Sequence, residues 1–174
     1  MIILEDTRQQ AEKHKLKHLW FKRNGIEVRR TKLYCGDYTL PTDQTVCIDT
    51  KKGMQEIYGD LVSQHNRFKA EADRAYESGI RLIILIEDDN VKDLEGVKNW
   101  RNPRYIRYCK IKNAHEHGKM LNVPLAKKPP VNNVTLLKIM STFGKEHHVE
   151  WAFCKPKDAG RRIIELLGGQ NEDA

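Results

Sequence analysis

Residues 33–51 read LYCGDYTLPTDQTVCIDTK, and this stretch predicts two neighbouring strands joined by a short turn. Residues 33–40 and 45–51 are rich in apolar, aromatic and β-branched side chains, which are typical of strands. Residues 41–44 lie between them and include proline and aspartate, which favour turns. The stretch therefore predicts a hairpin whose two strands lie side by side.

Charged side chains stand at the ends of these two apolar strands, where a purely structural role does not require them. Successive side chains of a strand point to opposite faces, so Cys47, Asp49 and Lys51 share one face. The hairpin brings Asp37 alongside from the preceding strand. We therefore expect two carboxylates and one ammonium group to converge on one patch.

The flanking sequence alternates between strand and helix patterns. Short apolar runs predict further strands at residues 2–4, 26–30, 80–86 and 149–154. Amphipathic stretches predict helices at residues 9–24, 54–78, 134–143 and 157–167. This order of elements predicts an α/β fold with a mixed central sheet flanked by helices on both faces.

Apolar spacing also predicts which side chains of two helices face the core. In the helix at 9–24, the stripe consists of Leu16, Leu19 and Trp20. In the helix at 54–78, the expected inward side chains are Ile57, Leu61, Val62, Phe68 and Ala72.

Residues 88–133 interrupt the alternation of strands and helices. Loops longer than about 12–15 residues are uncommon in compact domains, so this stretch is either a functional insertion or partly disordered. We expect residues 1–174 to form a single domain that carries a basic insertion at about 88–133.

The overall charge favours a polyanionic partner. Lys and Arg outnumber Asp and Glu by 31 to 24, which gives a net charge of +7. Clustered cations gain free energy by displacing counterions from phosphates, so nucleic acid is the expected partner.

The composition also bears on cellular location. A mean hydropathy of −0.69 and the lack of a long apolar run exclude a membrane span. The first residues, MIILEDTR, are acidic where a secretion signal would be basic and then apolar. The four cysteines contain no C-x-x-C pair and are expected to be reduced thiols. We therefore expect an intracellular protein, cytoplasmic or nucleoid-associated, or nuclear in a eukaryote.

The patch formed by Asp37, Asp49 and Lys51 suits phosphodiester hydrolysis. A hard cation can polarise a phosphate and lower the pKa of a water, and Mg²⁺ accepts two carboxylates with several waters. A lysine can hold the attacking water or offset the charge that builds on phosphorus. The alternative, which D-x-K spacing alone leaves open, is a solvated ion pair across two strands.

Four motifs follow one another along the chain: Glu5-Asp6-Thr7-Arg8, Gly25-Ile26-Glu27-Val28, Gly36-Asp37-Tyr38 and Ile48-Asp49-Thr50-Lys51. In this order they resemble the XPF-type nuclease domain, a branch of the PD-(D/E)XK superfamily. Arg67-Phe68, residues 71–74 and residues 80–87 continue the resemblance, and residues 134–167 are similar to the last helix–strand–helix of that family. The resemblance implies a restriction-endonuclease-like fold and a Mg²⁺- or Mn²⁺-dependent endonuclease acting on branched, flapped or forked DNA.

The resemblance also implies roles for individual residues. Asp37 and Asp49 are expected to be metal ligands, with the carbonyl group of Thr50 as a third. Lys51 is expected to be the catalytic lysine, and Asp6 to occupy the acidic position beside the site.

Contacts with DNA phosphates are expected from Arg8 and Arg67, and the resemblance implies a homodimer. In the insertion, Trp100, Tyr105 and Tyr108 alternate with cations that include Arg104 and Arg107. Such mixing suits single-stranded nucleic acid, because bases stack on rings while cations follow the backbone. The insertion is then expected to guide DNA into the site. The alternative is an ordinary basic surface whose aromatic side chains pack inward.

The sequence departs from the family pattern at three positions. Asp49 stands in place of the usual glutamate, and Thr50 in place of arginine. Gln55 occupies the position of the last family aspartate, with Glu56 next to it as a possible substitute. Two alternatives to a branched-DNA endonuclease therefore stay open. One is a non-catalytic DNA-binding subunit of an XPF-like complex, and the other is a restriction-type or junction-resolving nuclease that shares only the catalytic core.

Overall fold

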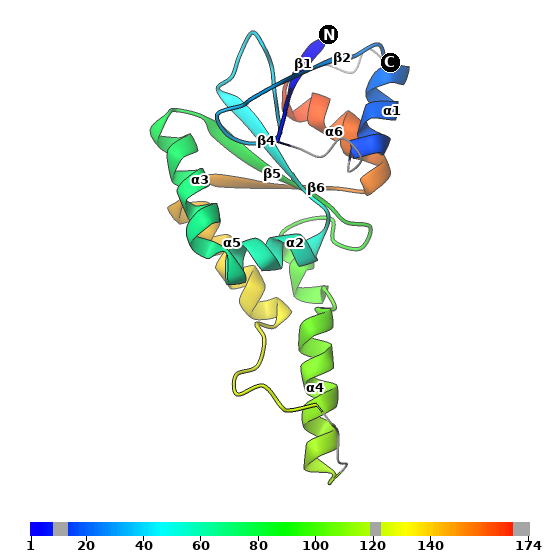
Figure 1. Ribbon diagram of the computed structural model, residues 1–174, viewed down its shortest axis with the longest axis vertical. Coiled ribbons are helices and arrows are strands. Elements are labelled where there is room, and N and C mark those ends of the chain that lie inside the picture. The colour runs from blue at the N-terminus through cyan, green and yellow to red at the C-terminus, as the bar shows by residue number, and fades with distance from the viewer. Residues whose placement is uncertain (9–13, 119–122, 169–174) are drawn as a thin grey trace.

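A six-stranded mixed sheet forms the centre of the molecule in the computed structural model, which describes residues 1–8, 14–118 and 123–168 (Figure 1). Its strands are β1 (Ile2–Asp6), β2 (Glu27–Thr31), β3 (Tyr38–Thr39), β4 (Val46–Lys51), β5 (Arg81–Glu87) and β6 (Val149–Cys154). They lie in the order β2-β1-β3-β4-β5-β6. Only β3 runs against its neighbours β1 and β4, so the other strands are parallel and their carboxyl ends meet at one edge.

Helices cover both faces of this sheet. The covering helices are α1 (Lys15–Arg23), α2 (Met54–Tyr58), α3 (His65–Glu77), α5 (Asn133–Glu146) and α6 (Ala159–Leu166), whereas α4 (Pro103–Glu116) projects from the sheet. Shorter helical turns are η2 (Gly59–Ser63), η3 (Glu95–Asn99) and η4 (Pro156–Asp158). The predicted α/β class with a mixed sheet between helices is confirmed.

The core has two parts because strand side chains alternate between the faces of the sheet. In β5, Leu82, Ile84 and Ile86 pack under α2, α3 and α5, whereas Ile83 and Leu85 pack under α1 and α6. All five of these side chains are buried. An almost entirely apolar strand is therefore explained by helices on both sides.

The predicted hairpin is shorter on its first side. Residues 33–37 are not in a strand, and β3 contains only Tyr38 and Thr39, with Tyr38 opposite Ile48 of β4. Gly36 has φ +66°, a left-handed conformation outside the range of a strand, and β3 begins only after Asp37.

The predicted helix at 54–78 is interrupted. It consists of α2, a π-helical turn η2 and then α3, which begins after Gln64. The prediction that Val62 faces the core is wrong, since this side chain is 37% exposed, whereas Ile57, Leu61, Phe68 and Ala72 are buried. The π turn shifts the helical register, which explains why only Val62 is misplaced.

The apolar stripe predicted in the first helix is wrong for Leu16 and Leu19, whereas Trp20 packs against the core. Leu16 and Leu19 are 60% and 51% exposed, and the buried side chains of α1 are Lys17 and Phe21. Trp20 packs on Gly160 of α6, so closely that a Cβ atom at position 160 would lie 3.0 Å from the Trp20 Cβ atom. Part of the predicted helix, residues 9–13, lies outside the described residues.

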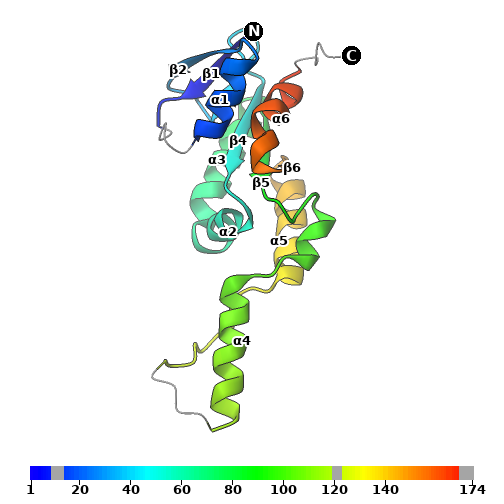
Figure 2. The ribbon, with the colours of Figure 1, turned by 90° about the vertical axis from the view of Figure 1, so that its right-hand side faces the viewer.

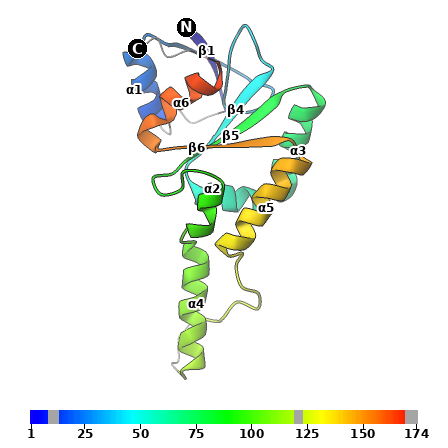
Figure 3. The ribbon, with the colours of Figure 1, turned by 180° about the vertical axis from the view of Figure 1, so that it is seen from behind.

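The stretch at 88–133 contains two helical elements that the sequence pattern did not predict, η3 and α4. Helix α4 points away from the sheet along the long axis of the molecule (Figures 1 and 2). The view from behind shows the same projection, with residues 123–132 leading back to α5 (Figure 3). None of the helices in the described ranges is both long enough and apolar enough to cross a membrane.

Candidate active site

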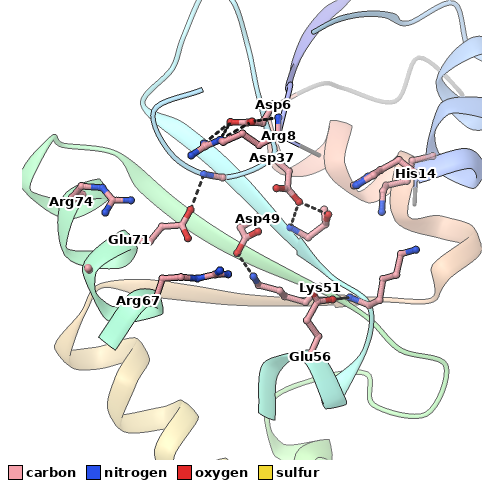
Figure 4. A pocket seen from close by; sticks show the side chains of 15 residues that line it. Asp6, Arg8, His14, Asp37, Asp49, Lys51, Glu56, Arg67, Glu71 and Arg74 are labelled. Carbon is pink, nitrogen blue, oxygen red and sulfur yellow. Dashed lines mark hydrogen bonds and ion pairs between the residues drawn. The ribbon is translucent and has the colours of Figure 1, made fainter. Parts of the chain in front are cut away.

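A pocket of about 570 Å³ opens beside the carboxyl ends of β1 and β4, and residues of α2 and α3 line its other side. Asp6 ends β1, and Asp49 and Lys51 end β4, so the parallel arrangement places all three at the same edge. Asp37 reaches this edge from the bend before β3, as Figure 4 shows. Open α/β sheets commonly hold their ligands beyond the carboxyl ends of the strands.

Asp49 and Lys51 form a buried ion pair in the pocket. The Lys51 Nζ atom lies 2.8 Å from Asp49 Oδ2, and both side chains are less than 10% exposed. The predicted sharing of one strand face is therefore confirmed. Burial, followed by the negative charge of Asp37, raises the pKa of Asp49 well above its usual value, although Lys51 acts against this shift.

Lys51 has a second carboxylate partner. Its Nζ atom lies 2.9 Å from Asp60 Oδ2, in the π-helical turn η2, and 5.4 Å from the centre of the Phe68 ring. Burial would lower the pKa of Lys51, but Asp49 and Asp60 outweigh burial and raise this pKa. Lys51 is therefore a fixed cation at neutral pH and can act as a charge or a hydrogen-bond donor, not as a base.

Asp37 is held between two strands by its backbone and its side chain. The Asp37 amide donates to the Ile48 carbonyl at 2.7 Å, and the Asp6 amide donates to the Asp37 carbonyl at 2.9 Å. Asp37 Oδ2 accepts hydrogen bonds from the Thr50 amide and the Thr50 hydroxyl, at 2.9 Å and 2.6 Å. Burial raises the pKa of Asp37, and the bonds from Thr50 oppose that rise.

Asp6 lies beside the site but its oxygens already have partners. Oδ1 accepts from the Arg8 amide at 2.7 Å, and Oδ2 accepts from Arg8 Nη2 at 2.5 Å and from the Leu33 amide at 3.1 Å. Burial would raise the pKa of Asp6, but these bonds outweigh burial and lower it. Asp6 therefore orients Arg8, whose side chain is 57% exposed.

Cations and acids of α2 and α3 line the other side of the pocket. Arg67, Glu71 and Arg74 line it from α3, and Glu71 Oε1 accepts from the Gly36 amide at 3.4 Å. Glu56 lines it from α2, whereas Gln55 is exposed on the helix. Of the two residues at the position of the last family aspartate, Glu56 is the one that lies in the pocket.

A buried polar network supports the pocket from the side of α1. Glu5 Oε1 accepts a hydrogen bond from the Tyr38 hydroxyl at 2.8 Å and contacts His18 Nε2 at 2.7 Å. The Tyr38 hydroxyl also lies 2.8 Å from His14 Nδ1. Burial, followed by the charge of Lys17, lowers the pKa of His14 to about 4, so His14 is neutral at neutral pH.

The donors present fit a hard divalent cation. Asp37 and Asp49 are both buried, and Asp49 Oδ2 has no hydrogen-bond partner in the described chain apart from its ion pair with Lys51. Within the described residues, no three His, Cys, Asp or Glu side chains form a ready-made ligand group. Two carboxylates suffice for Mg²⁺, which keeps several waters and takes carbonyl oxygens as well.

Most of the predicted site residues meet in this pocket. Those that line it are Asp6, Arg8, Asp37, Asp49, Thr50, Lys51 and Arg67. Arg104 and Arg107 lie instead on the projecting helix α4, outside the residues that line the pocket. All four cysteines are free thiols.

Sequence reasoning missed Asp60 and His14. A signal for Asp60 was present, since this acid stands between Ile57 and Leu61 on the apolar side of a predicted helix, where a charge needs a partner. No comparable signal marks His14, because its position in the pocket depends on contact with Tyr38, 24 residues further along the chain.

The arrangement of acids and lysine agrees with a comparison against known families. The family model described as ERCC4 domain matches residues 6–156. The chain belongs to the ERCC4 domain family. The resemblance read from the four motifs is thereby confirmed, and the chain carries a nuclease-type domain.

Solved structures support the same fold for this ERCC4 domain. XPF from Aeropyrum pernix matches with a TM-score of 0.60 and 15% identity, and its complex with DNA with a TM-score of 0.58 and 16% identity. Each match covers 96% of this chain but 63% of the XPF chain, so the ERCC4 domain corresponds to part of that protein. No curated protein sequence matches the chain significantly.

Proposed function

We propose that this chain is a divalent-metal-dependent DNA endonuclease that hydrolyses phosphodiester bonds in branched, flapped or forked DNA. The observation that carries the proposal is the buried Asp49–Lys51 pair, 2.8 Å apart, in a pocket that Asp37 also lines. The membership of the ERCC4 domain family supports it, as does the likeness to an XPF that is solved in complex with DNA.

Asp37 and Asp49 would hold the metal, Mg²⁺ or Mn²⁺, with the Thr50 carbonyl as a further oxygen donor. When bound, such an ion supplies Lewis-acid polarisation of the phosphate and a more acidic water. The bonds from the Thr50 amide and hydroxyl fix the Asp37 carboxylate before any ligand arrives. A donor set held in this way loses little conformational entropy when it takes up the ion.

Lys51 acts as a permanent positive charge beside the reacting phosphate. Its ion pairs with Asp49 and Asp60 keep the ammonium group in place and protonated. Three N–H groups on Lys51 allow it to donate a hydrogen bond to the attacking water or to a phosphate oxygen while it keeps its carboxylate partners. The negative charge that develops on the phosphate is thereby stabilised at a buried site, where electrostatic interactions are strong.

Arginine side chains at the mouth of the pocket would bind phosphates. Asp6 orients the guanidinium group of Arg8 through hydrogen bonds to Nε and Nη2, while most of the Arg8 side chain stays exposed. Arg67 lines the opposite wall from α3 (Figure 4). A DNA backbone that enters between the two walls would therefore meet a cation on each side. Both arginines are binding residues in this proposal, and Asp6 is a positioning residue.

The test is cleavage of end-labelled flap, fork and four-way-junction DNA with Mg²⁺ or Mn²⁺. The wild-type chain is expected to cut at least one of the branched substrates, and Asp49→Ala to lower the rate about 100-fold or more. Asp89→Ala, at an exposed carboxylate outside the pocket, serves as the matched control and should cut like the wild type. Equal cleavage by wild type and Asp49→Ala would rule out the assignment. Preference for four-way junctions alone would favour a junction-resolving enzyme.

A non-catalytic DNA-binding subunit is the second candidate. It is favoured by one observation, that Gln55 stands at the position of the last family aspartate and is an exposed residue outside the pocket lining. Such a subunit would bind the substrates with the same affinity whether Asp49 is present or replaced, and would cut none of them. The homodimer that the family resemblance implies stays a prediction, which sedimentation of the chain with and without DNA would check.

A further inference from the structure

Helix α4 has no evident structural purpose within the chain. None of its residues, all of which the structure describes, is buried, and it projects from the body of the molecule (Figure 2). A 14-residue helix is marginally stable in water and normally gains its stability by packing an apolar face. We refer to α4, Pro103–Glu116, as the basic arm.

The exposed side chains of the basic arm are mainly cations. Arg104, Arg107, Lys110 and Lys112 are all exposed, against one acid, Glu116, which lies 3.6 Å from Lys112. Arg104, Arg107 and Lys110 follow one another at three-residue spacing, about 4.5 Å apart along the helix axis, so they form a stripe along one side. The charge of this surface is complementary to a polyanion.

The aromatic side chains of this region do not form an open stacking surface. Trp100 packs against the core, with its ring 6.3 Å from that of Tyr58, and Tyr105 and Tyr108 are half-buried. The expectation that these rings stack on single-stranded bases is therefore not supported by their placement. Phosphates are the groups that the exposed cations can reach.

The root of the arm is fixed beside the pocket. Asn102 caps α4 through the Arg104 amide at 3.0 Å and donates to the Val131 carbonyl at 2.8 Å. The Val131 amide donates to the Tyr58 hydroxyl at 3.1 Å, and the Arg104 guanidinium lies 5.1 Å from the Tyr58 ring centre. Tyr58 belongs to α2, the same short helix that brings Glu56 into the pocket. The arm therefore starts at a defined place next to the site.

We propose that the basic arm lies along the DNA duplex that flanks the cleavage site and binds its phosphate backbone without reading bases. This inference rests on the proposed function, since it assigns the surface that holds the substrate beside the pocket. The arm is about 21 Å long and would span about 6 base pairs of duplex. Duplex is favoured over single strand because it carries twice the charge per unit length.

The test measures DNA affinity against salt for the full chain without divalent cation, so that the DNA stays intact. Each phosphate contact adds about 0.9 to the slope of log affinity against log salt. Arg107→Glu combined with Lys110→Glu should lower the slope by about 2 on a flap with a long duplex flank. The loss of affinity relative to the wild type should be about tenfold larger at about 50 mM than at about 200 mM salt.

Lys22→Glu combined with Arg23→Glu is the matched control. Both cations are exposed and lie at the end of α1, at the opposite end of the molecule from the arm (Figure 1). This control carries the same charge change and should keep the wild-type slope within about 0.5, because less than one phosphate contact is lost. An equal drop in slope for the control would overturn the proposal, since it would reflect net charge alone.

Shorter duplex flanks on the DNA substrate supply a second measurement of affinity. Shortening the duplex flank below about 6 base pairs should lower wild-type affinity to the level of the arm variant. Replacing that flank by single strand should do the same. The proposal fails if the arm variant keeps the wild-type slope or if the length of the flank has no effect on DNA affinity. It also fails if the arm variant binds DNA like the wild type and differs from it only in sedimentation. Metal-dependent cleavage by the wild type would still support the proposed function in each of these cases.

Discussion

Gly36 determines how Asp37 enters the site. It has φ +66°, and a Cβ atom there would lie 3.0 Å from the Ile48 carbonyl oxygen. Gly25 has almost the same φ, +64°, but a Cβ atom there would meet no other atom within 4 Å. A comparison of the two glycines therefore separates the cost of the backbone conformation from the cost of the close contact with β4.

We expect Gly36→Ala to destabilise the protein more than Gly25→Ala. Both substitutions place alanine in a left-handed conformation, which costs about 1–2 kcal/mol. Gly36→Ala adds the contact with the Ile48 carbonyl and should lower the free energy of unfolding by about 1 kcal/mol more. Urea denaturation of the two variants measures this difference. Equal losses would mean that the contact with β4 relaxes without cost.

His14 makes stability depend on pH. Its pKa is about 4 in the folded protein, lowered by burial and by Lys17, against 6.5 in an unfolded chain. Between these values the unfolded chain binds the proton and the folded protein does not, so stability falls as pH decreases from about 6.5 to about 4. The contribution is complete above pH 6.5 and amounts to about 3 kcal/mol.

His14→Asn should remove this pH dependence while it keeps a polar contact for the Tyr38 hydroxyl. Urea denaturation at about pH 7 and about pH 4.5 should show a loss for the wild type that is larger by about 2–3 kcal/mol than the loss for the variant. Carboxylates titrate equally in both proteins and cancel in the comparison. Identical losses would show that His14 is protonated in the folded state as easily as in the unfolded chain.

At the scale of residues, strand periodicity was sufficient to place Asp49 and Lys51 together. The two-residue alternation depends on backbone geometry alone, so it holds wherever the strand forms. The role of Asp6 in orienting Arg8 needed a structure, because the Leu33 amide that completes its hydrogen bonds comes from 27 residues further along the chain. The same holds for His14 and Tyr38.

At the scale of elements, the segment α2–η2–α3 differs most from a regular helix. The π-helical turn η2 buries two adjacent side chains, Asp60 and Leu61. π turns occur often at functional sites, and this one brings Asp60 to Lys51. Helical spacing in the sequence could not predict it, since the 3.6-residue period assumes one register from residue 54 to residue 78.

Asp60→Asn is expected to cost stability through the loss of a buried ion pair. The change keeps the shape of the side chain but leaves Lys51 with Asp49 as its acidic partner, so the free energy of unfolding should fall by about 1–3 kcal/mol. Glu95→Gln, which breaks an exposed pair with Lys98 at 3.4 Å, is the control and should cost less than about 1 kcal/mol. Denaturant unfolding of the two variants decides the matter. Equal costs would mean that Lys51 finds another partner.

The strands were the elements that the sequence predicted best. β5 contains a continuous apolar run at residues 82–86, and Gly79 ends the helix before it, so the extent of the strand could be predicted to within a residue. The orientation of α1 could not be predicted, because Lys17 turns inward to pair with Glu87 at the end of β5. Lys17 and Phe21 therefore face inward instead of Leu16 and Leu19, and the partner of Lys17 lies 70 positions further along the chain.

At the scale of the whole molecule, the sheet with its covering helices, which we call the body, and the basic arm differ in how they are stabilised. The body is held by two apolar cores, one on each face of the sheet. The arm contributes no buried side chain to either core. The two ends of the longer segment that carries the arm nevertheless meet, since the Asn102 side chain donates a hydrogen bond to the Val131 carbonyl.

Replacing residues 103–130 by a short glycine linker should therefore leave the body folded. The free energy of unfolding should change by less than about 1 kcal/mol, because none of the side chains that the structure describes between residues 103 and 130 is fully buried. DNA affinity should fall, and the salt dependence of binding should weaken. Thermal unfolding and DNA titration of the same preparation check both outcomes. Loss of cooperative unfolding would show that the arm is part of the folding unit.

The most direct test of the account is a titration with Mn²⁺, followed by the electron paramagnetic resonance signal of the free ion. The wild type is expected to bind the ion at the carboxylate pair, and Asp49→Asn to lose that site, whereas Asp89→Asn should bind like the wild type. Circular dichroism verifies that each variant is folded. Equal Mn²⁺ uptake by wild type and Asp49→Asn would contradict the claim that Asp37 and Asp49 hold a metal ion beside Lys51.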